Sequence, residues 1–235
     1  TDVIRDILFQ FLYLLIILSF LIGCNKPAVD RSLITGDPCS VPCWHNLIPG
    51  ESGEDDVRRE LTASPFVGKD SLTFQATEEN DIALTVFSWE DHESPPYNRV
   101  FLRDGKILRI EIYPDYKLTL SNIVSTFGDP EGIYAFSIAR ETITLKFILD
   151  YPSKGLSIVS YTPRVNPKKA FTSVGAILDG DLAVMRIHYY APTSLETALR
   201  DVFLLRPERV NKILSDVQKW KEFGQEVPFA EYDRP

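Results

Sequence analysis

The sequence predicts an α+β protein made of two tandem units, each a helix followed by a four-stranded antiparallel sheet, with a C-terminal helical segment. Apolar and polar residues alternate with the period of β-strands over several short stretches. A short amphipathic helix pattern precedes each set of strands. An Asp-Gly dipeptide, typical of a tight hairpin turn, lies in the last strand pair of each unit, at 104–105 and 179–180.

The first unit covers residues 43–115. Its helix is expected over 52–63, because Ser52 can cap the first turn and three acidic residues follow it, where the helix dipole favours negative charge. Pro65 ends this helix. The strands expected after it are 72–76, 82–89 and a hairpin over 99–114.

The second unit covers residues 116–192. Its helix is expected over 120–127, with Thr119 as the capping residue and Gly128 after its last turn. Alternating apolar residues predict the strands that follow. These are 134–138, 143–149, 156–158 and a hairpin over 174–192.

Residues 193–235 are expected to form the C-terminal helical segment. The capping-box pattern from Thr193 to Glu196 opens a first helix that reaches about Phe203. Pro207 suits the first position of a second helix, which Gly224 would end. Apolar residues at helical spacing favour packing of this helix against the second sheet, and a surface for a partner helix is the alternative. These residues are Val210, Ile213, Leu214, Val217 and Trp220.

The composition excludes two broad classes of protein. The 235 residues carry 25 Lys+Arg against 33 Asp+Glu, a formal charge of −8, and 44% of them are hydrophobic. That apolar fraction excludes a disordered acidic tail. Binding of nucleic acid needs clustered cations, and the sequence contains no block of Lys and Arg.

The N-terminal segment predicts attachment to a membrane. The uncharged run Ile7–Gly23 would span roughly 25 Å as a helix, short of the ~30 Å hydrocarbon core. It ends in Leu21-Ile22-Gly23-Cys24, which resembles the lipobox of bacterial lipoproteins. The resemblance implies a signal peptide over 1–23, a lipidated Cys24, a tether over 24–42 and an extracytoplasmic protein anchored to the bacterial cell membrane. The alternative is an uncleaved anchor helix that happens to end in cysteine.

Two cysteines remain once Cys24 is assigned to the lipid. Cys39 and Cys43 are expected to form a disulfide, since secreted proteins favour pairing. Free thiols are a second interpretation. A metal site made of these two cysteines and His45 is a third, although three ligands within seven residues form a weak zinc pattern.

A short motif after the tether resembles a group of uncharacterised bacterial lipoproteins. Pro42-Cys43-Trp44 is followed by Leu47-Ile48-Pro49-Gly50, and Trp220 with Phe223-Gly224 is similar to the aromatic-glycine tail of that group. The tandem units are also similar to the β-lactamase-inhibitor-protein-like fold. That similarity implies that partners contact an exposed sheet face, and it implies no activity and no site residues.

One face of the predicted sheets carries residue types that anchor protein interfaces. Aligning the hairpins on Arg109 and Arg186 turns Leu108, Ile110, Ile112, Met185, Ile187 and Tyr189 toward the helices. The opposite face is predicted to bind a protein or another envelope component, and the alternatives are a solvated face or one that the two halves cover. The predicted binding residues are Phe87, Trp89, Arg109, Glu111, Tyr113, Arg186, His188 and Tyr190.

The sequence contains no strong catalytic motif. The histidines His45, His92 and His188 lack metalloprotease spacing, and the sequence contains no phosphate loop, nucleophile elbow or dinucleotide fingerprint. The chain is therefore expected to bind rather than catalyse, without cofactor or metal. The alternatives are an envelope hydrolase that uses His92 or His188 with nearby carboxylates, and a purely scaffolding role in envelope maintenance. A hydrolase requires a deep pocket with a histidine and a carboxylate in contact, whereas a binding module requires a broad exposed aromatic face.

Lipidation at Cys24 predicts a simple labelling result. The wild-type protein, expressed in a bacterial host, is expected to incorporate labelled palmitate, and Cys24→Ala is expected to incorporate none because the thiol that forms the thioether is missing. Gel autoradiography measures both. Equal labelling of the two proteins would contradict the assignment.

Overall fold

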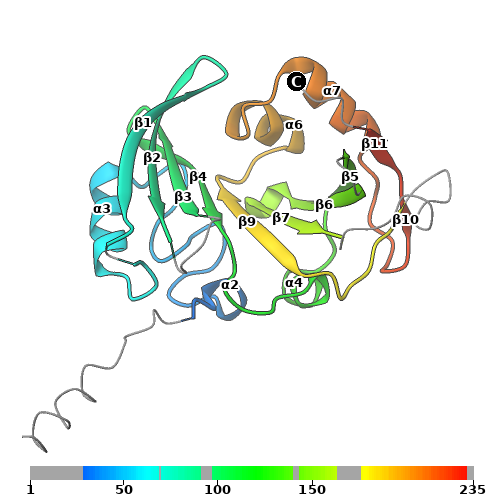
Figure 1. Ribbon diagram of the computed structural model, residues 1–235, viewed down its shortest axis with the longest axis horizontal. Helices are drawn as coiled ribbons and strands as arrows, with labels where there is room; N and C mark the ends of the chain where they lie inside the picture. Colours follow the sequence, from blue (N-terminus) through cyan, green and yellow to red (C-terminus); the bar gives the residue numbers. More distant parts are fainter. Residues whose placement is uncertain (1–28, 69, 91–96, 140–142, 163–175, 232–235) are drawn as a thin grey trace, which may run out of the picture.

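The centre of the computed structural model is a single nine-stranded sheet (Figure 1). The structure describes residues 29–68, 70–90, 97–139, 143–162 and 176–231. The strand order is β1-β2-β3-β4-β9-β7-β6-β5-β11, and every neighbouring pair is antiparallel except β5 with β11. The strands are β1 (Thr73–Glu79), β2 (Ile82–Trp89), β3 (Asn98–Arg103), β4 (Lys106–Ile112), β5 (Gly132–Ala139), β6 (Ile143–Tyr151), β7 (Leu156–Tyr161), β9 (Val184–Tyr190) and β11 (Phe229–Glu231). The predicted α+β class with mainly antiparallel strands is confirmed.

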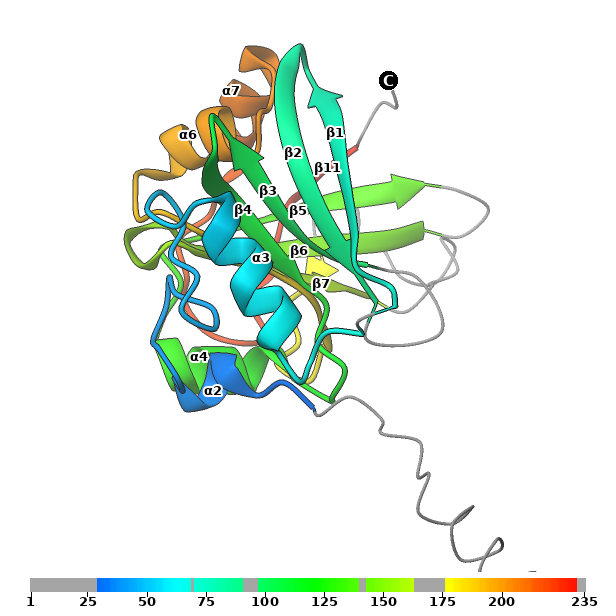
Figure 2. The ribbon, with the colours of Figure 1, turned by 90° about the vertical axis from the view of Figure 1, so that its left-hand side faces the viewer.

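Helices pack on both faces of this sheet. The first face carries α2 (Ser32–Thr35), α3 (Glu54–Ala63) and α4 (Leu120–Phe127), all of which contribute to one large apolar core. The other face carries α6 (Leu195–Thr197), the π-helical turn η2 (Ala198–Val202) and α7 (Pro207–Asp216). Figure 2 shows α3 lying across the first strands, well away from α6 and α7. The remaining elements are the 3₁₀ turn η1 (Pro152–Lys154) and a small pair of strands, β8 (Ala176–Ile177) with β10 (Glu226–Val227).

The two predicted helices of the units form with one difference in their capping. Thr119 caps α4 as expected, and its side chain accepts a hydrogen bond from the backbone N–H of Asn122. The cap of α3 is Gly53, whose N–H donates to the carboxylate of Asp56. Ser52, the expected cap, instead accepts a hydrogen bond from the N–H of Ile48. The acidic first turn of α3 is therefore the signal that located this helix.

Only the first of the two predicted hairpins forms. Asp104 and Gly105 both have positive φ angles, as the tight turn between β3 and β4 requires. The prediction of a second hairpin, at Asp179-Gly180, is wrong, because β8 pairs with β10 and not with β9. Both edges of β9 are already paired, with β4 and with β7. The Asp-Gly dipeptide at this place is an ordinary turn.

The strands β4 and β9 each contain a β-bulge directly before an arginine. Leu108 is the extra residue where β4 pairs with β3, and Met185 is the extra residue where β9 pairs with β7. An extra residue interrupts the alternation of faces. Leu108 therefore packs with Leu204 of the C-terminal segment and not in the large core, and Met185 is 44% exposed. The prediction that both turn toward the helices is wrong, whereas it is confirmed for Ile110, Ile112, Ile187 and Tyr189.

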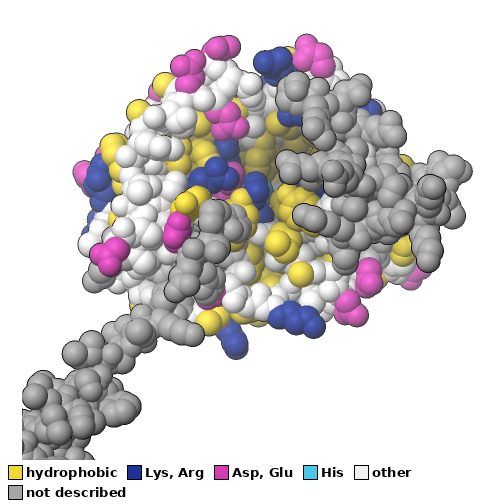
Figure 3. Space-filling view, in the orientation of Figure 1, with side chains coloured by type: hydrophobic (Ala, Val, Ile, Leu, Met, Phe, Trp, Pro, Cys, Tyr) yellow, Lys and Arg dark blue, Asp and Glu magenta, His cyan; other side chains and the backbone are white. Residues whose placement is uncertain are grey.

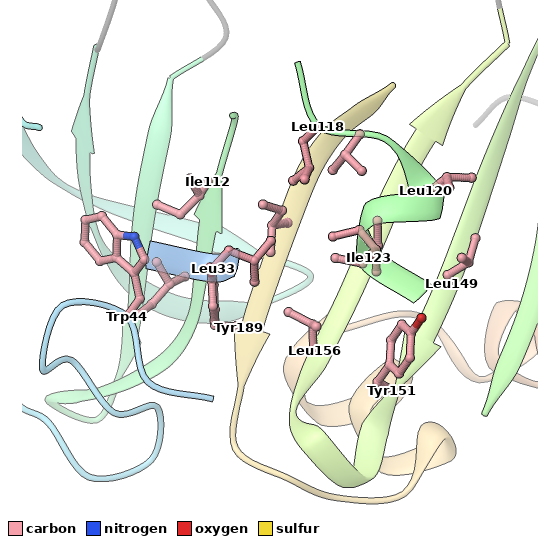
Figure 4. Close-up of a cluster of buried hydrophobic side chains, with 14 of the residues drawn as sticks. Leu33, Trp44, Ile112, Leu118, Leu120, Ile123, Leu149, Tyr151, Leu156 and Tyr189 are labelled. Atoms are coloured by element: carbon pink, nitrogen blue, oxygen red, sulfur yellow. The ribbon is translucent and has the colours of Figure 1, made fainter. Parts of the chain in front are cut away.

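A continuous apolar core joins the two halves of the chain on the α3–α4 face (Figure 4). Trp44 and Leu33 lie at one end of the close-up, Leu120 and Ile123 of α4 at the other, and Tyr189 of β9 between them. Each of these five side chains is less than a tenth exposed. The sheet pairing of β4 with β9 and this shared core make one folded body from residues that the sequence assigned to two units.

The segment expected as a tether contacts that body. Leu33 of α2 is buried in the core, and Asp30 accepts a hydrogen bond from the indole N–H of Trp44 at 2.8 Å. The described part of the predicted tether, residues 29–42, is therefore packed rather than extended into solvent. Cys24 and the run Ile7–Gly23 lie outside the described residues. Within the described ranges, no helix is both long and apolar enough to cross a membrane.

The bulges predict which apolar side chains matter for stability. Ile110→Ala is expected to lower the free energy of unfolding by about 2–5 kcal/mol, because Ile110 is fully buried. Met185→Ala is expected to change it by about 0.5 kcal/mol or less, because the bulge turns Met185 to solvent. Urea denaturation measures both. Similar losses in the two variants would show that β9 has no bulge.

Candidate functional site

Polar side chains form a row across five neighbouring strands, on the face opposite the large core. Arg99 of β3 is opposite Glu111 of β4, which is opposite His188 of β9. The row continues to Ser157 of β7 and Asp150 of β6. Residues directly opposite each other in a sheet project from the same face, so these five side chains are neighbours. Three of them were missed in the sequence, and the sheet pairing brings all five together.

Glu111 is the buried centre of this row. Its carboxylate accepts hydrogen bonds from Arg99 (Nη2 to Oε2, 2.7 Å) and from Arg109 (Nε to Oε1, 3.2 Å), and Nη1 of Arg186 lies 3.9 Å from Oε2. The side chain is 5% exposed. Burial by itself would raise the pKa of this carboxyl, but the surrounding cationic side chains lower it to about 2. Glu111 is therefore ionised at neutral pH.

Arg109 attaches the C-terminal segment to the sheet. Besides Glu111 it binds Glu79 of β1 (Nη2 to Oε2, 2.8 Å) and donates to the backbone carbonyl of Val202 in η2 at 2.8 Å. Its guanidinium lies 3.9 Å from the ring centre of Phe101. These contacts use the donors of Arg109 within the protein, and they hold η2 over the sheet.

Two further side chains bind backbone carbonyls of the same segment. Arg103 donates to the carbonyl of Asp201 at 3.2 Å, and Asn80 donates to the carbonyl of Leu204 at 2.7 Å. Both donors come from the first half of the chain.

Two helices form in the C-terminal segment, with Ser194 rather than Thr193 as the first cap and Pro207 opening α7. The prediction that the second helix continues to Gly224 is wrong, because α7 ends at Asp216 and the strands β10 and β11 follow it. The prediction that the apolar stripe packs against the second sheet is confirmed for Val210, Ile213, Leu214 and Val217, and the segment before α7 also contacts the first half of the sheet.

His188 is a buried, neutral imidazole. It is 6% exposed, and the ring of Phe203 lies against it with 5.2 Å between ring centres. Burial and the nearby cations Arg186 and Lys146 together lower its pKa to about 3, against the opposite effect of Glu111. Nδ1 lies 3.6 Å from Oε1 of Glu111, which is longer than a hydrogen bond.

A cavity of about 280 Å³ opens between this row and the C-terminal segment, and we call it the central cavity. Figure 3 shows the hollow in the middle of the molecule, with apolar and charged atoms side by side. Its charged and histidine lining residues are Glu79, Arg109, Glu111, Lys146, Arg186, His188 and Arg209. Its other lining residues are Tyr134, Phe136, Ile148, Ser157, Val159, Leu199, Phe203, Leu205 and Ile213.

Lys146 and Arg186 each carry a donor group without a hydrogen-bond acceptor among the described residues. Among the described residues, no hydrogen bond or ion pair is recorded for the ammonium group of Lys146. Burial lowers its pKa to about 8. The Nε atom of Arg186 is buried and makes no hydrogen bond, and neither does Nδ1 of His188. The guanidinium of Arg186 lies 4.8 Å from the ring centre of Tyr113. The cavity thus presents unsatisfied donors.

The predicted exposed binding face is wrong. Arg109, Glu111, Arg186 and His188 do share one face, and Tyr190 lies beside them against Phe203. However, the C-terminal segment covers this face, so that Arg109, Glu111, His188 and Tyr190 are buried. Tyr113 and Arg186 are partly buried. The prediction identified the correct sheet face for these residues, but not the C-terminal segment that covers it.

Phe87 and Trp89 lie on the other face of the sheet. Phe87 is opposite Val100 in β3, and Val100 is opposite Ile110, whose side chain belongs to the large core. Trp89 is 1% exposed and stacks on Trp44 with 5.4 Å between ring centres. Assigning these two aromatic residues to the binding face is therefore wrong. The face of a strand depends on its register with its neighbours, which alternation within one strand does not reveal.

Sequence reasoning also missed Lys146, although a signal was present. Its strand alternates Leu145, Phe147 and Leu149 on the core face with Lys146 and Ile148 on the other. A lysine on an otherwise apolar strand indicates a special environment, because an unpaired buried ammonium is costly.

The disulfide predicted between Cys39 and Cys43 is confirmed. The interpretations as free thiols or as a metal site with His45 are therefore wrong. His45 instead binds Asp30, with 3.1 Å between Nε2 and Oδ1, and Asp30 also accepts the indole hydrogen bond of Trp44. This arrangement holds the N-terminal part of the described chain against the core. His92, the other proposed catalytic histidine, lies outside the described residues.

The buried charge cluster predicts a pH-dependent loss of stability in Glu111→Gln. At pH 6 the variant is expected to lose about 3–5 kcal/mol, because the arginines around residue 111 lose their buried counter-charge. The pKa of Glu111 is lowered on folding, so its contribution is present above pH 4.5 and disappears as the pH falls toward 2. Urea unfolding at pH 6 and pH 3 measures the difference between wild type and variant.

Glu54→Gln is the matched control, because Glu54 forms an exposed ion pair with Arg58. It is expected to cost about 1 kcal/mol or less. Equal costs at residues 54 and 111 would contradict the central role of Glu111.

Comparisons with known proteins add no assignment to this geometry. No family model matches the chain, and neither a curated protein nor a solved structure matches it.

Proposed function

We propose that this protein is a lipid-anchored binding protein of the bacterial envelope that takes a small anionic ligand into its central cavity. Cys24 carries the lipid in this proposal, and the folded body stays at the extracytoplasmic surface. The binding site is the covered face of the sheet rather than an exposed one. The partner is therefore a small molecule that enters the cavity, and not a flat protein surface.

One observation carries the proposal: among the described residues, polar groups that line the cavity have no hydrogen-bond partner. Nε of Arg186 and Nδ1 of His188 are buried without one, and the ammonium group of the partly buried Lys146 lines the same cavity. Buried donors in folded proteins nearly always have a partner, which a ligand anion supplies here. Carboxylate and phosphate oxygens accept hydrogen bonds and carry the matching charge.

The charge balance of the cavity supports an anion. Four cationic side chains line it, namely Arg109, Lys146, Arg186 and Arg209, against the carboxylates of Glu79 and Glu111. The excess is positive, although the whole chain has a formal charge of −8. A cationic cavity with low-dielectric walls focuses its electric field, and this field attracts anions in preference to cations.

The proposal includes an origin of the cavity from two copies of one unit. Aligning the sequences of β4 and β9 on Arg109 and Arg186 also aligns Glu111 with His188 and the bulge at Leu108 with the bulge at Met185. Glu111 is directly opposite His188 where β4 meets β9. A pseudo-twofold axis between these two residues explains why both bulges and both arginines lie at the junction, where bulges commonly aim side chains at a site.

A hydrolase has one supporting observation, the order Glu111, His188 and Ser157 on three adjacent strands. A carboxylate, an imidazole and a hydroxyl in that order are the groups of a serine hydrolase. The required pocket is present, but the base is weak, since the pKa of His188 is lowered to about 3. The oxygens of Glu111 are also occupied by arginines. The geometry therefore supports binding better than hydrolysis.

The proposal predicts sulfate binding that depends on Lys146. NMR titration of the full chain with sulfate, followed at the His188 imidazole, is expected to show saturable binding. Lys146→Met is expected to weaken it about tenfold or more, because a charge-assisted hydrogen bond is lost. The control Lys117→Met removes an exposed lysine and is expected to leave binding unchanged.

The pH dependence is expected to follow the same lysine. The ammonium of Lys146 loses its proton as the pH rises past about 8, so the affinity for sulfate falls above pH 8 in wild type. Sulfate itself keeps its charge over this range. In Lys146→Met the affinity is expected to stay level between pH 7 and 9. Equal sulfate affinity in wild type and Lys146→Met at pH 7 would refute the proposed site.

A further inference from the structure

The central cavity has two chemically different ends. The polar end carries Arg186 and His188 of β9, and Lys146 comes from β6, two strands away and opposite Phe136 of β5. The apolar end lies between β5, β6 and β7 on one side and η2 and α7 on the other. Phe203 also lines the cavity, and its ring lies against His188.

The second end is apolar on both sides. Phe136 and Tyr134 of β5 pack edge to face at 5.3 Å between ring centres, and Ile148 of β6 lies beside them in the same cluster. From the C-terminal segment, Leu199 and Ile213 complete this cluster. Apolar side chains that line open volume lack dispersion contacts on that side, and an apolar group of a ligand would supply them. An anion without an apolar portion would leave this end unfilled.

Leu205 and Phe203 stand at the edge of the apolar end. Both are partly buried and line the cavity, whereas the core residues around them are almost fully buried. The volume of about 280 Å³ lies at the lower limit of ordinary ligand pockets, so one short chain fits and a two-chain lipid does not.

We infer that the ligand is a single-chain amphiphile, an alkyl carboxylate whose head binds Lys146 and Arg186 and whose chain occupies the apolar end. This inference rests on the proposed anion site and adds the chemical class of the ligand. The head satisfies the donors at the polar end, and the chain removes apolar surface from water at the other. His188, as a neutral imidazole next to Phe203, lies where head and chain meet.

The test is a chain-length series. Calorimetric titration of the full chain in lipid nanodiscs uses acetate, butanoate, hexanoate, octanoate and decanoate, with empty nanodiscs as the reference for partition into lipid. Each added methylene is expected to tighten binding about fourfold until the cavity is full, after which the affinity levels off. Alcohols of the same chain length are expected to bind at least about tenfold more weakly, because they lack the charged head.

Two variants separate the head from the chain. Lys146→Met is expected to weaken every carboxylate by a similar factor and to leave the alcohols unchanged. Leu205→Trp, which fills the apolar end, is expected to leave acetate binding unchanged and to remove the gain per methylene. Thermal unfolding of both variants shows whether they are folded before they are titrated.

The outcomes distinguish this inference from the proposed function. Carboxylate binding that depends on Lys146 but not on chain length would overturn the amphiphile and retain the anion site. Binding of alcohols as tight as that of carboxylates would overturn the role of the charged head. Loss of all dependence on Lys146, for sulfate as well as for carboxylates, would overturn both.

Discussion

The buried carboxylate of Glu111 is the interaction on which the rest of this structure depends. It lies at the junction of β4 and β9, where the first and second halves of the chain meet, and it is the shared counter-charge of Arg99, Arg109 and Arg186. Three guanidinium groups on one covered sheet face would otherwise repel one another and bear the cost of desolvation. With Glu111 in place they order the face and set its charge.

The C-terminal segment depends on that arrangement. Arg109 is aligned by Glu111 and in turn holds the carbonyl of Val202, while Arg103 and Asn80 hold two carbonyls beside it. These contacts place η2 and α7 over the sheet and turn an open face into a cavity. Lys146, Arg186 and His188 then line the central cavity. The site that we propose for the ligand is thus a consequence of how the sheet is covered.

Local signals predicted most of the secondary structure. The cap at Thr119, the proline at 207 and the Asp-Gly turn at 104–105 each act over one or two turns of chain, and all three formed as expected. The failures share a cause. The turn at 179–180 resembles the one at 104–105 in sequence, but β9 had no free edge for a hairpin. Phe87 and Trp89 lie on the face opposite to the predicted one, because the face of each residue depends on the register of its strand with the neighbouring strands.

The sequence by itself determined the α+β class, the element order from α3 to β7, the disulfide of Cys39 with Cys43 and the shared face of Arg109, Glu111, Arg186 and His188. These follow from periodicity, capping and short spacing, which are local properties. Only the tertiary structure decided that the two halves join edge to edge, that Lys146 belongs with that face, and that the face is covered. Those facts depend on contacts between residues far apart in the chain, where pairing energy and burial, rather than local pattern, select the partner.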